Sequence, residues 1–584
     1  MNFLRNLLAT ILGLFIFTFL CFLLFIGIIS IASTEKEVQL ADASILHLKL
    51  NRPIVERKTE DPFAAFNEAL GGGEGAIGLK EIKEAIYHAK NDPKIEGIFL
   101  EPQYLSSGFA KLEEIRDALD DFKSSGKFVV AYSEAYSEAD YFVASVAEKI
   151  YLNPMGMLEF NGLSTEVVFL KGTLDKLGIE PQIFKVGDFK SAVEPFTRTE
   201  MSEPSRLQTE SFINSIYDSY LERVAESRGV EIAKLREISS SMLVQNANDA
   251  LNYKLVSDLG YKDEVFDSFK EEIGVKEDED LTFIDHVNYL KTFTKTEISQ
   301  NRIAVIVANG NIVTGEGSDV SIGSDLFAEE IRKARKDDKI KAIVLRINSP
   351  GGSALASDII WREVKLAQKE KPVIASMSDV AASGGYYIAM ACDTIVAHPT
   401  TITGSIGVFG ILPNAKEFLE EKLGVTTDVV KTGKYSDILT VTRPLSDFEK
   451  QIFQKSVEEI YETFTKKAAQ GRGMPIEDLK AVASGRVWSG VEAKEKKLID
   501  VFGGLEDAIN IAVNKVGIED DYKVNYYPKQ KSMLEQFLEE FGGEVRYSFM
   551  KNEFGQLAPY IQKLKELEEL SGIQARMPFD YVIQ

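Results

Sequence analysis

The two halves of this 584-residue chain carry the same sequence pattern. The stretch "NDPKIEGIFL", which starts at Asn91, resembles "KDDKIKAIVL", which starts at Lys336, 245 residues later. At the same spacing, "DYFVASVAEKIYLNP" from Asp140 resembles "GYYIAMACDTIVAHP" from Gly385. A pattern that recurs at a fixed spacing predicts one structural unit built twice. The fold must therefore allow two copies of the same domain to pack in tandem.

Each copy alternates short apolar runs with longer helical patterns. In the second copy we expect strands at residues 343–347, 373–377 and 394–397, and helices at 325–336, 354–368 and 384–391. Such alternation predicts an α/β domain with mostly parallel strands. A longer polar helix follows each core, at 203–227 and at 446–469, and we expect these helices to pack between copies or subunits.

A long apolar run precedes the first copy. Residues 7–32 contain no charged side chain, and a helix of this length exceeds the roughly 30 Å hydrocarbon core of a bilayer. A cleavable signal peptide is the alternative, but its apolar core is only about 7–15 residues long. We therefore expect a retained single-pass anchor. Arg5 precedes the run and no net positive charge follows it, so the positive-inside rule places the rest of the chain outside the cytoplasm.

The overall charge limits the partners. Acidic residues outnumber basic ones by 90 to 67, giving a net charge of −23, and no block of basic residues is present. Nucleic acid is therefore not an expected partner. The two cysteines, Cys21 and Cys392, lie in separate apolar segments and provide no disulfide framework. The four histidines are scattered, so no metal site is predicted.

The two copies differ where chemistry could occur. The second copy contains "SPGG" from Ser349, "SGG" from Ser383 and "TGSIG" from Thr403. At the same spacing, the first copy contains "YLSS", "EAD" and "LEFNG". Because the first copy keeps the apolar framework without these serines and glycines, we expect them to serve more than folding.

Ser383 follows a predicted strand and opens a predicted helix, where backbone N–H groups lack partners. An oxyanion would be stabilised there, and the glycines at Gly384, Gly351 and Gly352 would let a substrate carbonyl approach backbone donors. The alternative is that Ser383 only caps the helix. Three such motifs in one copy, absent from the other, favour a nucleophile.

A nucleophilic serine needs a base to accept its proton. His398 is the only histidine near these motifs and is one candidate. A lysine can also act if burial lowers its pKa from about 10.4 by roughly 3 units. Lys190 lies in "KVGDFKSAVEPFTR" of the first copy, opposite Ser436 in "KTGKYSDILTVTR" of the second. The sequence pattern alone does not select Lys190.

Four motifs in order carry a family resemblance. "FKVGDFKSAVEPFTR", "NSPGGS", "AASGGYY" and "TGSIG" resemble the long, two-repeat form of the signal peptide peptidase A (SppA) family, membrane-anchored serine proteases of bacterial envelopes. The resemblance runs from the apolar segment to "IQARMPF" near the C-terminus. It implies an α/β fold of tandem ClpP/crotonase-like repeats after an N-terminal transmembrane helix. The expected parts are an anchor at 1–34, repeats at 35–295 and 296–530, and a C-terminal segment at 531–584.

The resemblance also implies a Ser/Lys dyad that is split between the repeats. It assigns Ser383 as the nucleophile, Lys190 as the general base and Ser405 as the hydroxyl that orients the lysine amine. The oxyanion hole is assigned to backbone groups of Gly384, Gly351 and Gly352. No cofactor and no metal is implied.

The implied substrates are remnant signal peptides, cut within their apolar cores. The implied assembly is a homotetramer at the bacterial inner (cytoplasmic) membrane, with its active sites on the periplasmic side. Two other classes stay open: a crotonase-type acyl-CoA enzyme, which would share the fold and the oxyanion hole, and a non-catalytic membrane scaffold. A serine-directed covalent probe separates both from a protease.

Overall fold

The computed structural model describes most of the two predicted repeats. The described residues are 5–6, 10–17, 19–20, 38, 40–58, 75–276, 278–293, 299–318, 320–519, 521–529 and 572–577. Most of the predicted span at 7–32 lies outside these residues. Among the helices that are described, none combines the length and apolar character needed to cross a membrane.

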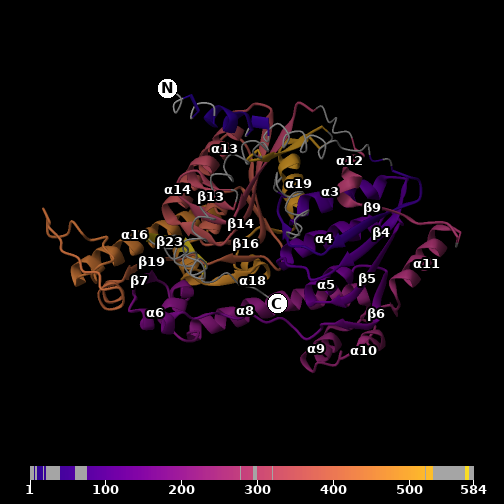
Figure 1. Ribbon diagram of the computed structural model, residues 1–584, viewed down its shortest axis with the longest axis horizontal. Coiled ribbons are helices and arrows are strands. Elements are labelled where there is room, and N and C mark those ends of the chain that lie inside the picture. Colours follow the sequence, from indigo (N-terminus) through magenta and orange to yellow (C-terminus); the bar gives the residue numbers. More distant parts are fainter. Residues whose placement is uncertain are drawn as a thin grey trace.

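The first repeat is built on a six-stranded parallel sheet (Figure 1). Its strand order is β8 (Asp258–Leu259), β6 (Lys149–Leu158), β5 (Phe128–Tyr136), β4 (Ile95–Pro102), β1 (Ser44–Leu50) and β9 (Thr282–Asp285). Helices α3 (Leu79–Asn91), α4 (Phe109–Lys123) and α5 (Glu138–Ala144) contribute to the core on one face, and α11 (Lys262–Ile273) covers the other. Burial on both faces explains why the central parts of these strands, such as "IFL" of β4 and "FVVA" of β5, are apolar.

The second repeat keeps this parallel core and extends it to eight strands. Its sheet runs β20 (Val487–Ser489), β18 (Ile402–Gly404), β16 (Val373–Ala382), β14 (Ile340–Ser349), β10 (Arg302–Asn309) and β22 (Lys523–Tyr527). Strand β17 (Thr394–Ala397) pairs with β16, β21 (Val501–Phe502) pairs with β17, and β20 is antiparallel to β18. Helices α13 (Ser324–Lys336), α14 (Ala354–Ala367) and α15 (Gly384–Ala389) pack on one face, and α19 (Leu505–Val516) packs on the other. The predicted strands and helices of this copy are confirmed, and so is the tandem α/β repeat.

A third sheet joins the repeats. Its order is β12 (Gly317–Ser318), β13 (Ser321–Gly323), β11 (Asn311–Val313), β15 (Gly351–Ser353), β23 (Gly572–Arg576), β19 (Val408–Asn414) and β7 (Glu180–Val186). The first-repeat strand β7 pairs antiparallel with second-repeat strand β19 along its whole length. The chain segment that follows β7 is therefore delivered to the second repeat.

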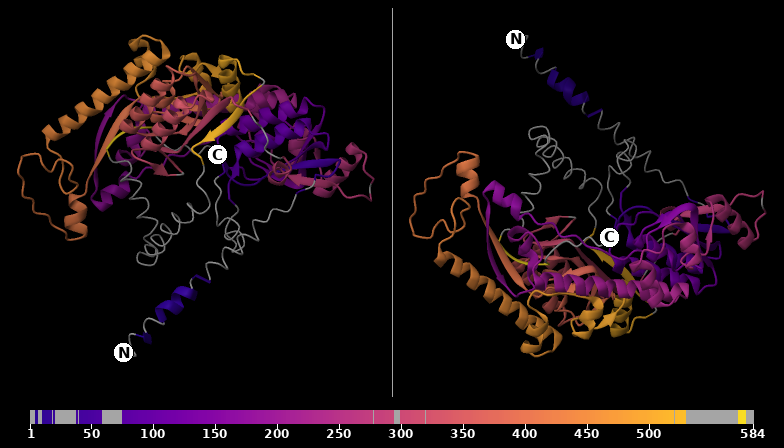
Figure 2. Two further views of the ribbon diagram at one scale, coloured as in Figure 1. Left: turned by 90° about the horizontal axis from the view of Figure 1, so that it is seen from above. Right: turned by 90° about the horizontal axis from the view of Figure 1, so that it is seen from below.

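Two long helices connect the repeats, as the sequence predicted. Helix α8 (Glu203–Arg228) crosses beneath both repeats (Figure 1), and its Ser215 hydroxyl lies 2.7 Å from the Ser489 hydroxyl of β20. Helix α16 (Asp447–Arg472) packs on β7, where Gln454 donates a hydrogen bond to the Lys185 carbonyl at 3.3 Å. The segment between β19 and α16, orange in Figure 2, projects away from the body of the molecule.

Candidate active site

Ser383 lies at the turn between β16 and α15. Its backbone has φ 54° and ψ −109°, a combination that is strained for any residue other than glycine. Such strain is concentrated at functional sites, where the surrounding structure holds the residue in place. The Ser383 hydroxyl makes no capping hydrogen bond to α15. The alternative that this side chain serves only as a helix cap is therefore wrong.

The side chain of Lys190 reaches Ser383 from the other repeat. Lys190 Nζ lies 3.0 Å from Ser383 Oγ, 3.0 Å from Ser405 Oγ and 3.3 Å from the Ser405 carbonyl oxygen. The structure thus brings together the three side chains that the family resemblance assigned to the site. Their chain positions are far apart, and the β7–β19 pairing closes that separation.

The Lys190 amine is fully buried. Burial lowers its pKa well below the usual value near 10.5, and no acidic side chain in the described part of the chain offsets this effect. Lys190 therefore has the burial that a lysine needs to act as the base. A neutral amine 3.0 Å from a serine hydroxyl can accept its proton.

Ser405 fixes the position of the Lys190 amine. The Ser405 hydroxyl donates to the Gly485 carbonyl at 3.2 Å, which leaves its lone pairs to accept from Lys190 Nζ. Ser405 also has a positive φ of 47°. A Cβ on Gly485 would lie 2.7 Å from the Lys190 Cβ, so only glycine lets this segment approach the lysine so closely.

The glycines predicted to form the oxyanion hole lie together beside Ser383. A Cβ on Gly351 would lie 2.7 Å from the Gly384 nitrogen, which leaves no space for a side chain. Gly351 also has φ 102°, a backbone conformation that favours glycine. The Gly351 N–H donates to the Ser349 hydroxyl at 3.1 Å. The described geometry therefore places the Gly351-Gly352 turn against the first residue of α15.

The corresponding place in the first repeat is filled by carboxylates. Glu138, the counterpart of Ser383, accepts hydrogen bonds from the backbone N–H groups of Asn161 at 2.8 Å and Gly162 at 2.7 Å. Asp140 accepts from Tyr104 and Leu105 nearby. These bonds use backbone donors that a substrate would need, so the first repeat supplies a lysine and no second site.

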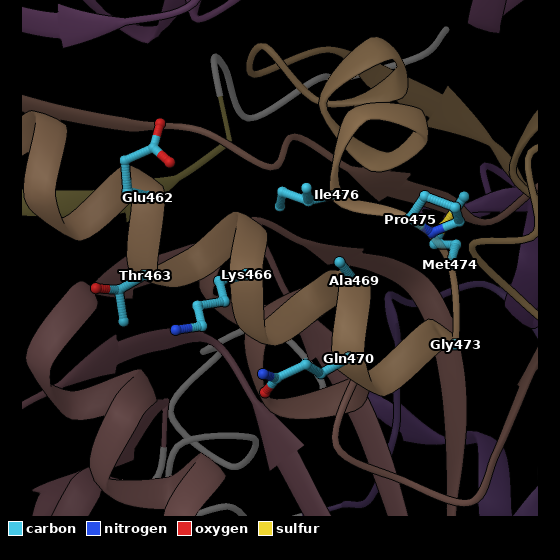
Figure 3. A pocket seen from close by; sticks show the side chains of 9 residues that line it. All are labelled: Glu462, Thr463, Lys466, Ala469, Gln470, Gly473, Met474, Pro475 and Ile476. Carbon is cyan, nitrogen blue, oxygen red and sulfur yellow. The ribbon is translucent and has the colours of Figure 1, made fainter.

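A surface hollow in the second repeat is separate from this chemistry. Side chains from α16 and the turn that follows it line the hollow, among them Lys466 and Gln470 (Figure 3). None of its lining residues is Ser383, Lys190 or Ser405. The hollow is therefore not the place where Ser383 and Lys190 meet.

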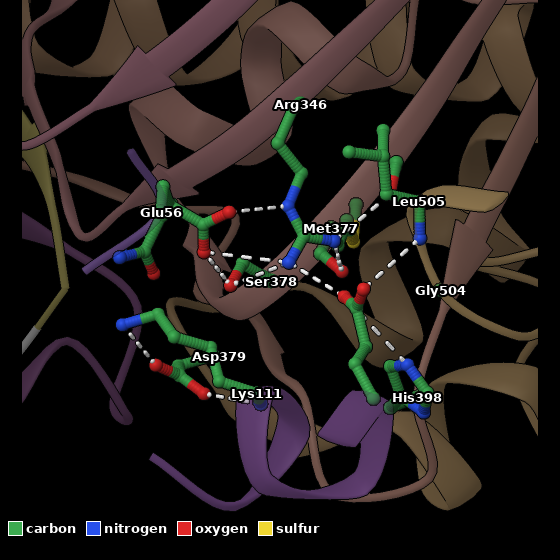
Figure 4. Close-up of polar contacts among 12 residues, drawn as sticks. Glu56, Lys111, Arg346, Met377, Ser378, Asp379, His398, Gly504 and Leu505 are labelled. Atoms are coloured by element: carbon green, nitrogen blue, oxygen red, sulfur yellow. Dashed lines mark hydrogen bonds and ion pairs between the residues drawn. The ribbon is translucent and has the colours of Figure 1, made fainter. Parts of the chain in front are cut away.

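His398 is buried in the contact between the repeats (Figure 4). Its Nδ1 lies 3.1 Å from Glu113 Oε2. Burial lowers the pKa of His398, but the hydrogen bond to Glu113 and the charges of Glu113 and Glu114 outweigh this effect, so the pKa is raised. The alternative that His398 is the base is not supported, because the contacts of Ser383 Oγ are with Lys190 and the Gly407 carbonyl. Within the described residues, no group of three or more His, Cys, Asp or Glu side chains could hold a metal ion.

Buried ion pairs hold the two repeats in register (Figure 4). Arg346 of β14 lies 2.7 Å from Glu56 and 2.6 Å from Glu114, both in the first repeat. Lys111 of α4 lies 2.8 Å from Asp379 of β16. Since Lys190 and Ser383 belong to different repeats, these pairs contribute to the geometry of the dyad.

Sequence reasoning missed Gln208 of α8. Its side chain donates to the Phe189 carbonyl at 3.1 Å and to the Ser191 hydroxyl at 2.8 Å, and accepts from the Val487 N–H at 3.1 Å. Gln208 therefore ties both neighbours of Lys190 to strand β20. A polar residue in the second turn of a long helix gave no local signal of this role.

Comparison with known proteins places the chain in a family. The model of peptidase family S49 matches residues 121–276 and matches again at residues 365–519. The chain belongs to peptidase family S49. The Clp protease model also matches, at residues 294–402. Together the matches confirm two tandem S49/ClpP-like domains, and the protein is a serine protease.

Full-length relatives of this S49 peptidase carry the same two-repeat sequence. The chain is 37% identical to "Serine protease SPPA, chloroplastic" of Arabidopsis thaliana, across 86% of this chain and 74% of that protein. It is 35% identical to "Protease 4" of Salmonella typhi, across 90% of this chain and 87% of that protein. A "Protease 4" of Haemophilus influenzae is 33% identical across 86% of this chain. The resemblance to the SppA family is confirmed.

Proposed function

We propose that this S49 peptidase is a membrane-anchored endopeptidase that degrades cleaved signal peptides through a Ser383–Lys190 dyad. The observation that supports the dyad is the 3.0 Å contact between the fully buried Lys190 amine and the Ser383 hydroxyl. The backbone of Ser383 at this contact is strained. Burial supports a lysine that is neutral near physiological pH.

The mechanism uses the residues of the site in a fixed order. Neutral Lys190 accepts the proton of Ser383 as its Oγ attacks the substrate carbonyl carbon. The negative charge that develops on the carbonyl oxygen is stabilised by the Gly384 N–H and the Gly351-Gly352 turn. The Lys190 ammonium then gives its proton to the leaving amine, and an acyl-enzyme forms on Ser383.

Deacylation repeats the proton transfers with water. Lys190, neutral again, accepts a proton from water, which attacks the acyl carbon and releases the carboxylate product. Ser383 regains its proton from Lys190. Throughout both steps, Ser405 holds the amine by accepting its hydrogen bond while donating to the Gly485 carbonyl.

The substrate class and location follow from the predicted anchor. A single-pass helix within residues 1–34 would hold the active site beside the inner membrane, where cleaved signal peptides remain. The charge around the apolar run favours a catalytic domain on the periplasmic side. The name "Protease 4" of the bacterial relatives is consistent with a protease role and specifies no substrate.

Assembly into a homotetramer is supported by two segments that lack the strands of their counterparts in the other repeat. Within one chain, β7 of the first repeat pairs with β19 of the second. With Gly187 aligned on Gly433, residues 426–432 correspond to β7, and at the spacing of 245 residues 163–169 correspond to β19, yet neither segment forms a β-strand of two or more residues. We propose that residues 426–432 of one copy pair with residues 163–169 of the next. Successive copies would then close into a ring.

A fluorophosphonate probe tests the proposed chemistry directly. Covalent labelling of the wild-type chain at Ser383, with none in Ser383→Ala, would support an activated serine. An acyl-CoA enzyme or a membrane scaffold would leave the serine unlabelled. No contact of the described residues favours either of these alternatives over a peptidase.

A further inference from the structure

Lys190 is the central residue of a tight turn. Its backbone has φ −76° and ψ 75°, close to the values of about −75° and +65° that define an inverse γ-turn. The hydrogen bond of that turn is present, because the Ser191 N–H donates to the Phe189 carbonyl at 2.8 Å. The backbone on both sides of Lys190 therefore determines the direction in which its side chain leaves the chain.

The side chain of Gln208 is bonded to both residues that flank Lys190. Its amide nitrogen donates to the Phe189 carbonyl at 3.1 Å and to the Ser191 hydroxyl at 2.8 Å. Gln208 is completely buried, so water cannot replace either bond. A rotation of the turn would break hydrogen bonds that the enclosed amide could not make elsewhere, and this cost resists a change in the turn.

The oxygen of the same amide contacts a segment that also holds Ser405. The Gln208 oxygen accepts from the Val487 N–H at 3.1 Å. We call residues 484–487 the bridging segment. Its carbonyls accept one hydrogen bond from the Phe189 N–H at 3.2 Å and two from Ser405, through the N–H at 2.6 Å and the hydroxyl at 3.2 Å. The bridging segment thus connects the turn that contains the lysine with the hydroxyl that orients its amine.

The bridging segment needs such support because its backbone is strained. Ser484 has φ 55° and Gly485 has φ 78°, so two successive residues lie in the left-handed region. For a residue with a Cβ, this conformation persists only where the surrounding structure holds it. The hydrogen bond from Val487 to Gln208 is one of the contacts that hold the segment.

We infer that Gln208 is a positioning residue for the general base. It acts through its hydrogen bonds, which hold the turn at Lys190 against the bridging segment and so keep the amine dry and within reach of Ser383 Oγ. This inference rests on the proposed function, since it takes Lys190 as the base. Without these bonds the turn would loosen and admit water to the amine, and water favours the charged form of a lysine.

Steady-state hydrolysis of a quenched apolar peptide by Gln208→Met tests this role. Methionine has a similar volume and makes none of the three hydrogen bonds. We expect kcat to fall by about 10- to 100-fold with KM nearly unchanged, because the position of the amine is lost and the binding of the peptide is not. The rise of kcat with pH should also move to higher pH, because contact with water brings the pKa of Lys190 closer to 10.5.

Gln182→Met is the matched control. Gln182 of β7 is also buried, and its side-chain oxygen accepts from the Leu445 N–H of the second repeat at 2.8 Å. This substitution removes a buried contact between the repeats without changing the neighbours of Lys190, so kcat and its pH dependence should match the wild type. Ser191→Ala removes one hydroxyl to which Gln208 donates, and it should lower kcat by about 2- to 10-fold and move the rise in the same direction.

The outcomes separate this inference from the proposed function. A wild-type kcat with an unmoved pH profile in folded Gln208→Met, or in Ser191→Ala where Gln208→Met does not fold, would overturn the positioning role and leave the dyad intact. Equal effects in Gln208→Met and Gln182→Met would also overturn it, because the loss of any buried contact between the repeats would then suffice. Full activity in Lys190→Met would instead contradict the proposed function itself.

Discussion

Lys190 Nζ lies 3.0 Å from Ser383 Oγ, and the two residues belong to different repeats of one chain. Strand β7 carries the lysine across the boundary by pairing with β19, and the first repeat's own counterpart site is occupied by Glu138. Duplication has thus produced one active site from two domains. Neither repeat contains the complete site on its own.

Replacement of Lys190 by methionine should lower the rate of hydrolysis without lowering the free energy of unfolding. The methionine side chain fills the buried space without an amine, so we expect hydrolysis to fall by about 10²–10⁴-fold. The free energy of unfolding should not fall, because the change removes a buried polar group that has no carboxylate partner. Peptide hydrolysis and urea unfolding of both chains provide the comparison.

The stability difference between these two chains should depend on pH. Lys190 has a lowered pKa in the folded chain and a value near 10.5 when unfolded. Between those values the unfolded chain binds a proton that the folded chain does not, so wild-type stability rises with pH in this window. The advantage of Lys190→Met should therefore shrink as the pH rises toward 10.5. A difference that is constant with pH would contradict the buried-amine interpretation.

Ser405→Ala tests the positioning of the amine. We expect a loss of about 10- to 100-fold in kcat, because one hydrogen bond to a charged group is removed. The lost bond also stabilised the ammonium, so the acid limb of the rate profile should move to lower pH. Thr465→Val is the matched control: the Thr465 hydroxyl is buried but donates to the Tyr461 carbonyl within α16 and makes no contact with Lys190 Nζ. Equal losses in both variants would argue against a specific role for Ser405.

The sequence predicted the repeats and the nucleophile better than it predicted the base. Strands β14, β16 and β17 each contain a short, mainly apolar run, and Ser383 stood out because the first copy lacks it. Lys190 came from a family resemblance, since nothing in its local sequence reveals that β7 pairs with β19. Gln208, Gly485 and strand β23 depend on contacts between distant segments, which local patterns do not encode.

Glu114→Gln should destabilise the contact between the repeats. Burial raises the pKa of Glu114, but the charges of Arg346 and Lys83 outweigh this effect and hold it well below its usual range. Breaking such a buried pair costs about 3–5 kcal/mol. Asp121→Asn, which weakens the exposed pair with Lys90, is the control and should cost less than about 1 kcal/mol.

The ion pair between Glu114 and Arg346 should also make the free energy of unfolding depend on pH in acid. Because the folded-state pKa of Glu114 is lowered, its stabilisation is complete above about pH 5 and is lost as the pH falls toward that lowered value. The gap in unfolding free energy between wild type and Glu114→Gln should therefore narrow in acid. An unchanged gap would mean that the pair is not ionised as described.

Val430→Asp tests the proposed assembly. Val430 is 99% exposed in the single chain, within the segment that corresponds to β7. A charge there should leave the folded chain as stable as the wild type but weaken association between copies. Sedimentation velocity of both chains in detergent measures this. A variant that assembles as well as the wild type would rule out pairing through residues 426–432.

The split dyad is tested most directly by the pH dependence of hydrolysis. A quenched apolar signal-peptide substrate would be assayed with the wild type, Ser383→Ala and Lys190→Ala, and circular dichroism would confirm that each chain is folded. The dyad predicts a wild-type rate that rises along a single deprotonation well below pH 10.5, and a rate at least about 10²-fold lower in either folded variant. Full activity in Lys190→Ala would contradict it and require another base.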